Sequence, residues 1–224
     1  MMCKSLAMQQ RSGMIFIRAG LILLFALFLP LLASGAGLSK ELAAAARAGD
    51  LAKVKALIAQ GADPNSFDDH GFTPTSGAVF YGKKDVVKYL LQNGADVNKN
   101  SKDGSTALIQ ACFRENSTIV KLLLEYGADV NKKNSVNGWT SLMTAVTSND
   151  NLDITSVLLE NGAKINEKNK ERLTALLLVS AVCDSRRGNY LISRGADKSS
   201  RADNGYTYFD YLSAPRCKGG GIKR

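Results

Sequence analysis

The sequence is poor in the residue types that build catalytic and metal sites. It has 224 residues and one histidine, His70. A multi-histidine metal site is therefore excluded, and a histidine-containing catalytic triad would have to use this one residue. None of the 4 cysteines forms a pair with zinc-finger spacing. These absences predict a protein that is not an enzyme and binds no cofactor or metal.

The charge of the chain is also modest. All 20 acidic residues lie after position 36, as do all of the 29 basic residues except Lys4, Arg11 and Arg18. The remainder thus has 26 basic against 20 acidic residues, a net charge of about +6. This excess favours a partner with an acidic surface, and it is too small to predict nucleic-acid binding.

What the chain does contain is a repeated motif that reads Gly-Ala-Asp-Val-Asn in its fullest form. The spacings between the successive glycines are 33, 33, 35 and 33 residues, a regularity typical of stacked structural repeats. Apolar residues between the motifs recur at helical spacing. Helix pairs this short cannot bury their apolar faces alone, so stacking of neighbouring units has to supply the core. The copies begin at Gly61, Gly94, Gly127, Gly162 and Gly195.

The unit resembles the ankyrin repeat. The family's Thr-Pro-Leu-His box corresponds to Thr73-Pro74-Thr75-Ser76, Thr106-Ala107-Leu108-Ile109, Thr140-Ser141-Leu142-Met143 and Thr174-Ala175-Leu176-Leu177. The resemblance implies an all-α solenoid of about five helix-turn-helix units with protruding β-turn fingers and a C-terminal capping helix. It also implies a protein-binding scaffold. The pattern departs from the family at Arg172, which replaces the turn glycine, and in the fourth unit, which is two residues longer.

The N-terminus has the pattern of a targeting segment. Basic residues precede an apolar run over 19–32, and small residues follow it, which together are typical of a secretory signal peptide cut after Ala36. The start could be Met1 or Met14. The alternative is an uncleaved anchor, although 18 residues barely span a membrane. We therefore predict a cleaved signal over 1–36, a repeat domain over 37–214 and a flexible basic tail over 215–224. With a cleaved signal, the expected location is the periplasm or the medium, and no membrane contact is expected. With an uncleaved anchor, the protein would stay in the membrane with its repeats outside the cytoplasm.

Counting from the box threonines predicts where a partner binds. In the family, partners commonly touch the finger tips and the exposed positions of the first helices. Aromatic residues and arginine dominate interface hot spots, and six such side chains fall at these positions in units two to four. The alternative is that several of the rings only pack between neighbouring fingers. The six are Phe72, Phe80, Tyr81, Phe113, Arg114 and Trp139.

The predicted fingers are also rich in basic residues. These side chains could steer an acidic partner, or they could form a solvated rim. They are Lys99, Lys102, Lys132, Lys133, Lys168, Lys170 and Arg172.

Three cysteines follow the predicted signal. Cys112 falls at a small-residue core position and is expected to be a buried free thiol. Cys183 stands where the family has a turn glycine, and Cys217 falls one repeat later and one place further on. Outside the cytoplasm these two could form a disulfide that clamps the C-terminal cap. Because disulfides limit the Cα–Cα distance to about 7 Å, such a bond requires the tail to fold back.

Together these features predict an exported, monomeric, non-catalytic binding module. It would bind a partner protein, and inhibit or protect it, through the concave face made by the fingers and first helices. The alternative is an effector that is secreted to act on a host protein.

Overall fold

The computed structural model describes residues 37–148 and 152–218. The predicted signal over 1–36, the end of the predicted tail and the insertion expected near 149–151 lie outside the described residues. Within them, all regular elements are helices. The first covers residues 37–48. It is followed by α2 (Leu51–Ala59), α3 (Pro74–Phe80), α4 (Lys84–Gln92), α5 (Ala107–Phe113), α6 (Ser117–Glu125), α7 (Ser141–Ser148), α8 (Leu152–Glu160), α9 (Ala175–Ala181), α10 (Ser185–Ser193), α11 (Tyr208–Leu212) and α12 (Pro215–Lys218).

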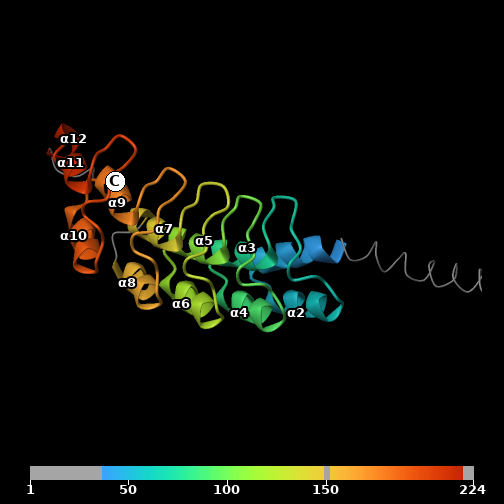
Figure 1. Ribbon diagram of the computed structural model, residues 1–224. Coiled ribbons are helices and arrows are strands. Elements are labelled where there is room, and N and C mark those ends of the chain that lie inside the picture. The colour runs from blue at the N-terminus through green and yellow to red at the C-terminus, as the bar shows by residue number, and fades with distance from the viewer. Residues whose placement is uncertain (1–36, 149–151, 219–224) are drawn as a thin grey trace, which may run out of the picture.

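The helices form two rows (Figure 1). The helix of residues 37–48 is followed in one row by α3, α5, α7 and α9, while α2, α4, α6, α8 and α10 make the other. In the first row, α3, α5, α7 and α9 pack on one another in order, and each also packs on the second helix of its own unit. The connecting loops rise past the first row as a series of fingers. This arrangement confirms the predicted all-α solenoid, with α11 covering its C-terminal end.

The box threonines start the first helices. Thr73, Thr106 and Thr174 are N-caps whose side-chain oxygens accept a hydrogen bond from the backbone N–H three residues later. Each cap satisfies one of the backbone donors that a helix start leaves unpaired. Pro74 follows its cap at the first helical position, where its missing N–H costs nothing.

The last residue of the repeated motif links each unit to the next. The side-chain amide of Asn65 donates to the carbonyl of Gly94 at 2.9 Å, and its oxygen accepts from the backbone N–H of Asp96 at 2.7 Å. Ser199 holds the corresponding place in the fifth unit, and within the described part of the chain its hydrogen bonds go only to Asp197 of its own loop. The asparagine ladder therefore ends where the array ends. The same pair of bonds is made by Asn98, Asn131 and Asn166.

The core is continuous along the array. Leucines at one position of successive second helices are fully buried. The facing first helices carry small residues that are also fully buried, which lets neighbouring units approach closely. The leucines are Leu90, Leu123, Leu158 and Leu191, and the small residues are Ala78, Ala111 and Ala145.

The fingers keep one turn geometry despite the departures in sequence. Gly71 has φ 83° and donates its N–H to Asp68, and Arg172 adopts φ 59° and makes the corresponding bond to Asn169, both at 3.0 Å. The finger that carries Arg172 therefore retains the turn without glycine. In the fourth unit the closing backbone bond runs from Asn134 to Trp139, one residue further than elsewhere.

The C-terminal end is built differently from the other units. At successive core positions of α10 stand Arg187 and Gly188, where α4, α6 and α8 carry valine, isoleucine or threonine. The guanidinium of Arg187 is buried and donates to Asp184 and to the carbonyl of Val146, each at 2.7 Å. The space left by Gly188 is filled by the ring of Tyr208, which is 1% exposed.

A disulfide joins the last helix to this end of the array. Cys183 and Cys217 have sulfur atoms 1.96 Å apart and Cα atoms 5.3 Å apart. Residues 215–218 of the predicted tail form α12, and the bond shows that Cys217 on this helix lies beside Cys183. Cys183 has φ 57°, so it takes the left-handed conformation of the glycine it replaces.

Candidate functional site

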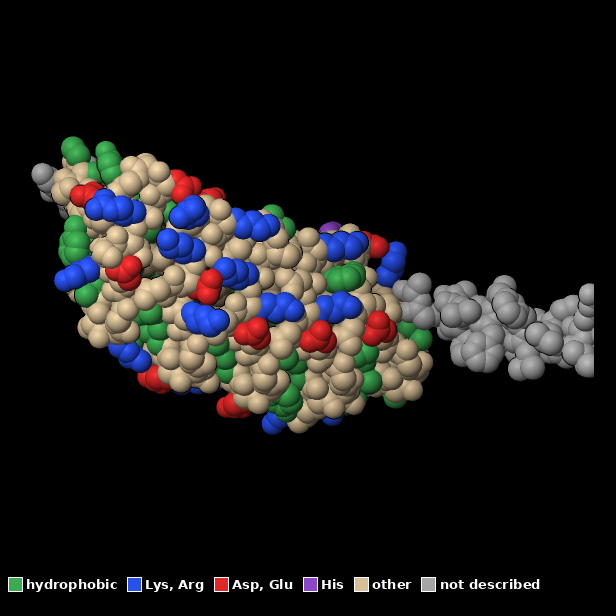
Figure 2. All heavy atoms as spheres, viewed as in Figure 1, with side chains coloured by type: hydrophobic (Ala, Val, Ile, Leu, Met, Phe, Trp, Pro, Cys, Tyr) green, Lys and Arg blue, Asp and Glu red, His purple; other side chains and the backbone are tan. Residues whose placement is uncertain are grey.

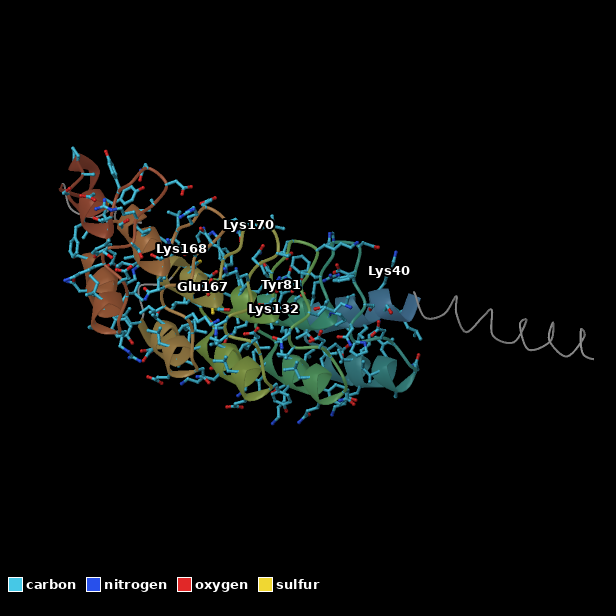
Figure 3. All side chains as sticks on the ribbon, in the orientation of Figure 1. Lys40, Tyr81, Lys132, Glu167, Lys168 and Lys170 are labelled. Atoms are coloured by element: carbon cyan, nitrogen blue, oxygen red, sulfur yellow. A yellow bond between two sulfur atoms is a disulfide. The ribbon has the colours of Figure 1, made fainter. Side chains whose placement is uncertain are left out.

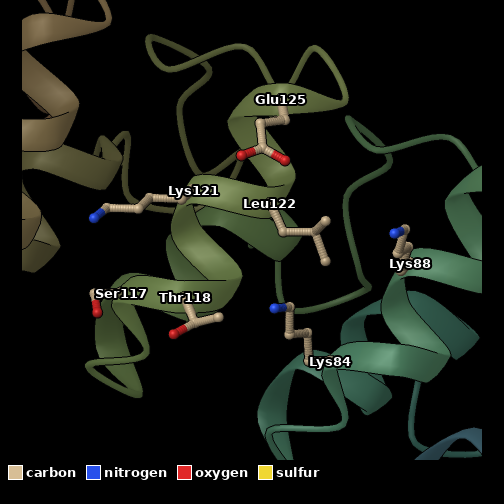
Figure 4. A pocket seen from close by; sticks show the side chains of 7 residues that line it. All are labelled: Lys84, Lys88, Ser117, Thr118, Lys121, Leu122 and Glu125. Atoms are coloured by element: carbon tan, nitrogen blue, oxygen red, sulfur yellow. The ribbon is translucent and has the colours of Figure 1, made fainter.

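The outer row of helices carries a shallow groove. It lies between α4 and α6 and has a volume of about 290 Å³. Figure 4 shows Lys121 pointing away from Lys84 and Lys88, so these lysines do not converge on one point. The three lysines are exposed, and the groove offers no buried polar group to orient a ligand. Its lining is Lys84, Lys88, Ser117, Thr118, Lys121, Leu122 and Glu125.

A second cavity, of about 430 Å³, opens among the fingers and first helices of units two to four. Four of the six predicted contact residues line it, namely Phe72, Phe80, Phe113 and Trp139. The other two lie beside it. The structure thus gathers side chains from α3, α5 and two fingers around one concavity, which we call the aromatic cavity.

Direct ring contacts organise one side of the aromatic cavity. The centroids of Phe72 and Phe80 are 6.3 Å apart, and Tyr81 meets Phe80 edge-on at 5.3 Å. The guanidinium of Arg114 lies 4.7 Å from the centroid of Phe80. Phe113 is 58% exposed and Tyr81 is 56% exposed. These two rings therefore keep most of their surface available to a ligand.

Phe72, Phe80 and Trp139 are partly buried by their own fold. Phe72 lies beside Phe80 of α3, and Trp139 packs against the buried core. Each still lines the aromatic cavity. Packing fixes their orientation, so a ligand would meet a preformed wall.

Sequence reasoning missed the polar lining of the aromatic cavity. Gln110 is 6% exposed, and its Oε1 has no hydrogen-bond partner within the described residues. Asp103, on the finger between α4 and α5, also lines the cavity. The sequence does mark the position of Gln110. Four residues after the box threonine, successive units carry Gly77, Gln110, Thr144 and Leu178, so the residue type there varies from unit to unit. The six predicted contact residues lie instead one residue before the threonine or seven and eight residues after it.

Several of the basic finger residues have structural contacts. Lys133 donates to the Glu167 carboxylate and to the carbonyl of Lys168, each at 2.8 Å, and Lys170 donates to the carbonyl of Ser135 at 2.7 Å. These bonds tie the finger between α6 and α7 to the finger between α8 and α9. The hydrogen bond from Lys133 lowers the pKa of Glu167. Arg172 pairs with Asp203 at 3.4 Å, and both side chains are largely exposed.

Other finger lysines leave their charge at the surface. The ammonium groups of Lys99 and Lys102 lie 5.0 and 5.9 Å from the ring centroid of Phe67. Figure 3 shows Lys168 and Lys170 on the finger between α8 and α9, with Glu167 close by. Figure 2 shows lysine and arginine side chains spread along this face, with acidic side chains among them. The face is basic but mixed.

The described residues contain no group of three or more histidine, cysteine or acidic side chains placed to hold a metal ion. Cys112 is a buried free thiol, and burial raises its pKa far above the ordinary range. Such a thiol is a poor nucleophile. Over the same residues, no helix is long and apolar enough to cross a membrane.

Comparison with known families identifies the class of protein. A family model for ankyrin repeats in three copies matches residues 31–101 and 93–169, which together make up more than half of the chain. The chain belongs to the ankyrin-repeat family, as the repeated motif predicted. Ankyrin repeats indicate a protein–protein interaction module, and the family is typically non-catalytic. A search of curated proteins found no match.

Proposed function

We propose that this protein binds its partner through the aromatic cavity and the exposed rings at its rim. The observation that carries the proposal is the convergence of Phe72, Phe80, Phe113 and Trp139 on one concavity of the finger face. Aromatic side chains held in a preformed pocket are the usual centre of a protein interface. Phe113 is the best single probe, because its exposed ring contributes little to the fold.

The test compares two phenylalanines. Phe113→Ala should weaken partner binding by about 2 kcal/mol, which is roughly 30-fold in Kd. Phe67→Ala is the matched control, since Phe67 is 39% exposed and lies outside the cavity lining. The partner is first captured on the immobilised full chain from an envelope fraction, and affinities are then measured with purified components. Equal affinities for the two variants would remove the aromatic cavity from consideration.

A partner with an acidic surface is the second part of the proposal. The net charge of about +6 after position 36 and the basic finger face support it. Lys132 and Lys168 are the residues to test, because within the described residues neither ammonium group forms a salt bridge. A Lys132→Glu/Lys168→Glu variant should slow association several-fold at low salt and leave dissociation unchanged. An association rate insensitive to salt would exclude steering.

We further propose export. The signal-like sequence over 1–36 supports it, and so does the pairing of Cys183 with Cys217, since disulfides persist mainly in oxidising compartments. N-terminal sequencing of the mature protein should begin at Gly37; an intact Met1 or Met14 would refute cleavage. An exported monomer that inhibits or protects an envelope enzyme is the favoured role. Capture of a host protein instead would indicate a secreted effector.

A further inference from the structure

The aromatic cavity has a charge opposite to that of its surroundings. Of the described residues that line it, Asp103 is the one with a charged side chain, although the finger face around it is basic. Asp103 Oδ1 accepts from the backbone N–H of Ser105 at 2.9 Å. No contact within the described residues engages Oδ2. One carboxylate oxygen is therefore available to a ligand.

Two hydroxyl groups of the lining offer acceptors as well. Gln110 also lines the cavity, but its Oε1 is shielded from solvent and does not face a ligand there. Thr144 and Thr147 donate their hydroxyl protons to the carbonyls of Thr140 and Met143, at 3.2 and 2.9 Å. Each hydroxyl has a single proton, so toward a ligand these two oxygens can only accept.

The walls of the cavity are flat aromatic surfaces. Phe80 already stacks one guanidinium of the chain, that of Arg114, at 4.7 Å, although Arg114 does not itself line the cavity. Aromatic walls, hydrogen-bond acceptors and a single negative charge together define a ligand that is flat, cationic and rich in donors. The guanidinium group has these properties: it is planar, has five N–H donors and no acceptor, and stacks on rings.

We propose that the aromatic cavity receives an arginine side chain of the partner protein. This inference rests on the proposed function and specifies what the partner presents there. The guanidinium would stack against the aromatic walls and bond to Asp103 Oδ2. A lysine would fit less well, because its ammonium is strongly hydrated and has no flat face. The partner would thus present an arginine within an otherwise acidic surface.

The test uses a small probe and an internal reporter. Trp139 is the one tryptophan of the sequence, so the intrinsic fluorescence of the full chain reports on the cavity wall. Titration with N-acetyl-arginine-N-methylamide should change this signal saturably, with a Kd on the order of 1 mM for so small a ligand. The neutral isostere N-acetyl-citrulline-N-methylamide should bind at least about tenfold more weakly. Equal binding of the two probes, or no saturable change with the arginine probe, would overturn the proposal.

Two variants assign the binding to the residues named. Asp103→Asn should weaken the arginine probe about tenfold and leave the citrulline probe unchanged, whereas Glu125→Gln removes an exposed charge on α6 and should change neither. Arg114→Gln removes a like charge from the rim, so the arginine probe should bind as tightly or a few-fold more tightly. A loss of arginine binding in Arg114→Gln, or none in Asp103→Asn, would contradict the assignment.

The inference and the proposed function can fail separately. If neither probe binds but Phe113→Ala weakens the natural partner, the cavity is an interface that does not take arginine. If the arginine probe binds but Phe113→Ala leaves partner affinity unchanged, the partner does not use the cavity, and both proposals fail for that partner.

Discussion

The fit between Gly188 and Tyr208 allows a quantitative test of how the array ends. A Cβ atom at position 188 would lie 2.6 Å from Cε2 of Tyr208, and closer still to Cζ and Oη. That is well inside van der Waals contact. The ring is 1% exposed and cannot swing aside without leaving its site. Gly188→Ala should therefore expel the ring from the cap.

Two opposing terms set the size of the effect. Expelling a buried aromatic ring costs about 3 kcal/mol, whereas replacing glycine by alanine within a helix gains about 1 kcal/mol. We expect Gly188→Ala to lower the free energy of unfolding by about 2 kcal/mol. In a Tyr208→Ala background the clash is absent, so the same substitution should raise it by about 1 kcal/mol. The coupling between the two sites is then about 3 kcal/mol.

The assay is urea denaturation of the four proteins of this cycle, combined with amide hydrogen exchange. Exchange is needed because repeat arrays can unfold from one end, and a single transition would hide a local effect. Protection should fall in α11 and α10 of Gly188→Ala and stay unchanged in α4 and α6. An equal effect of Gly188→Ala in both backgrounds would refute the reasoning.

Three further predictions concern the links that hold the array together. Reducing the Cys183–Cys217 bond, which closes a separation of 34 residues, should lower the free energy of unfolding by about 3 kcal/mol. Alkylation of the proposed mature chain, which starts at Gly37 and lacks Cys3, should label Cys112 alone in denaturant without reductant, whereas labelling of Cys183 and Cys217 as well would refute the bond. Asn98→Ala removes two hydrogen bonds between units and should lower the free energy of unfolding by about 2 kcal/mol, measured by chemical denaturation. Ser199 bonds within its own loop, so Ser199→Ala should lower it by less than about 0.5 kcal/mol. Equal losses in the two variants would contradict the role of the asparagine ladder. Burial raises the pKa of Asp184, but the hydrogen bonds from the backbone N–H and guanidinium of Arg187 outweigh it, so the pKa lies below its ordinary value. The resulting stability is present above about pH 4 and is lost as the pH falls through the folded-state pKa. In thermal melts, the fall in Tm from pH 7 to pH 3 should therefore be smaller for Asp184→Asn than for the unchanged protein.

The regular part of this molecule could be predicted from sequence because each unit repeats the same local solution. The box threonines cap the first helices, and the motif glycines end the second ones. Counting from these residues also predicted that Phe72, Phe80, Phe113 and Trp139 lie on one surface, and all four line one cavity. Periodicity gives the position of a side chain along and around the array, which was sufficient for the aromatic wall.

Apart from the Cys183–Cys217 bond, which the sequence offered as a possibility, features that depend on a single contact between distant residues were not predicted. Periodicity gives no reason for a buried Arg187, whose partner carbonyl belongs to Val146 in the preceding unit. Neither does it relate Gly188 to Tyr208, because nothing in the pattern says that a ring from the cap fills that space. Gln110 was missed for a related reason: the cavity that it lines is shared by several units, and no single unit defines it. Departures from the repeat mark these places without revealing their partners.

The central claim is that a partner protein occupies the aromatic cavity. Hydrogen exchange of the full chain with and without its captured partner tests this most directly. The account predicts slower exchange in the fingers that carry Phe72 and Trp139 and in α5 next to Phe113, with α4, α6 and α8 unchanged. Protection confined to the outer row of helices would contradict it.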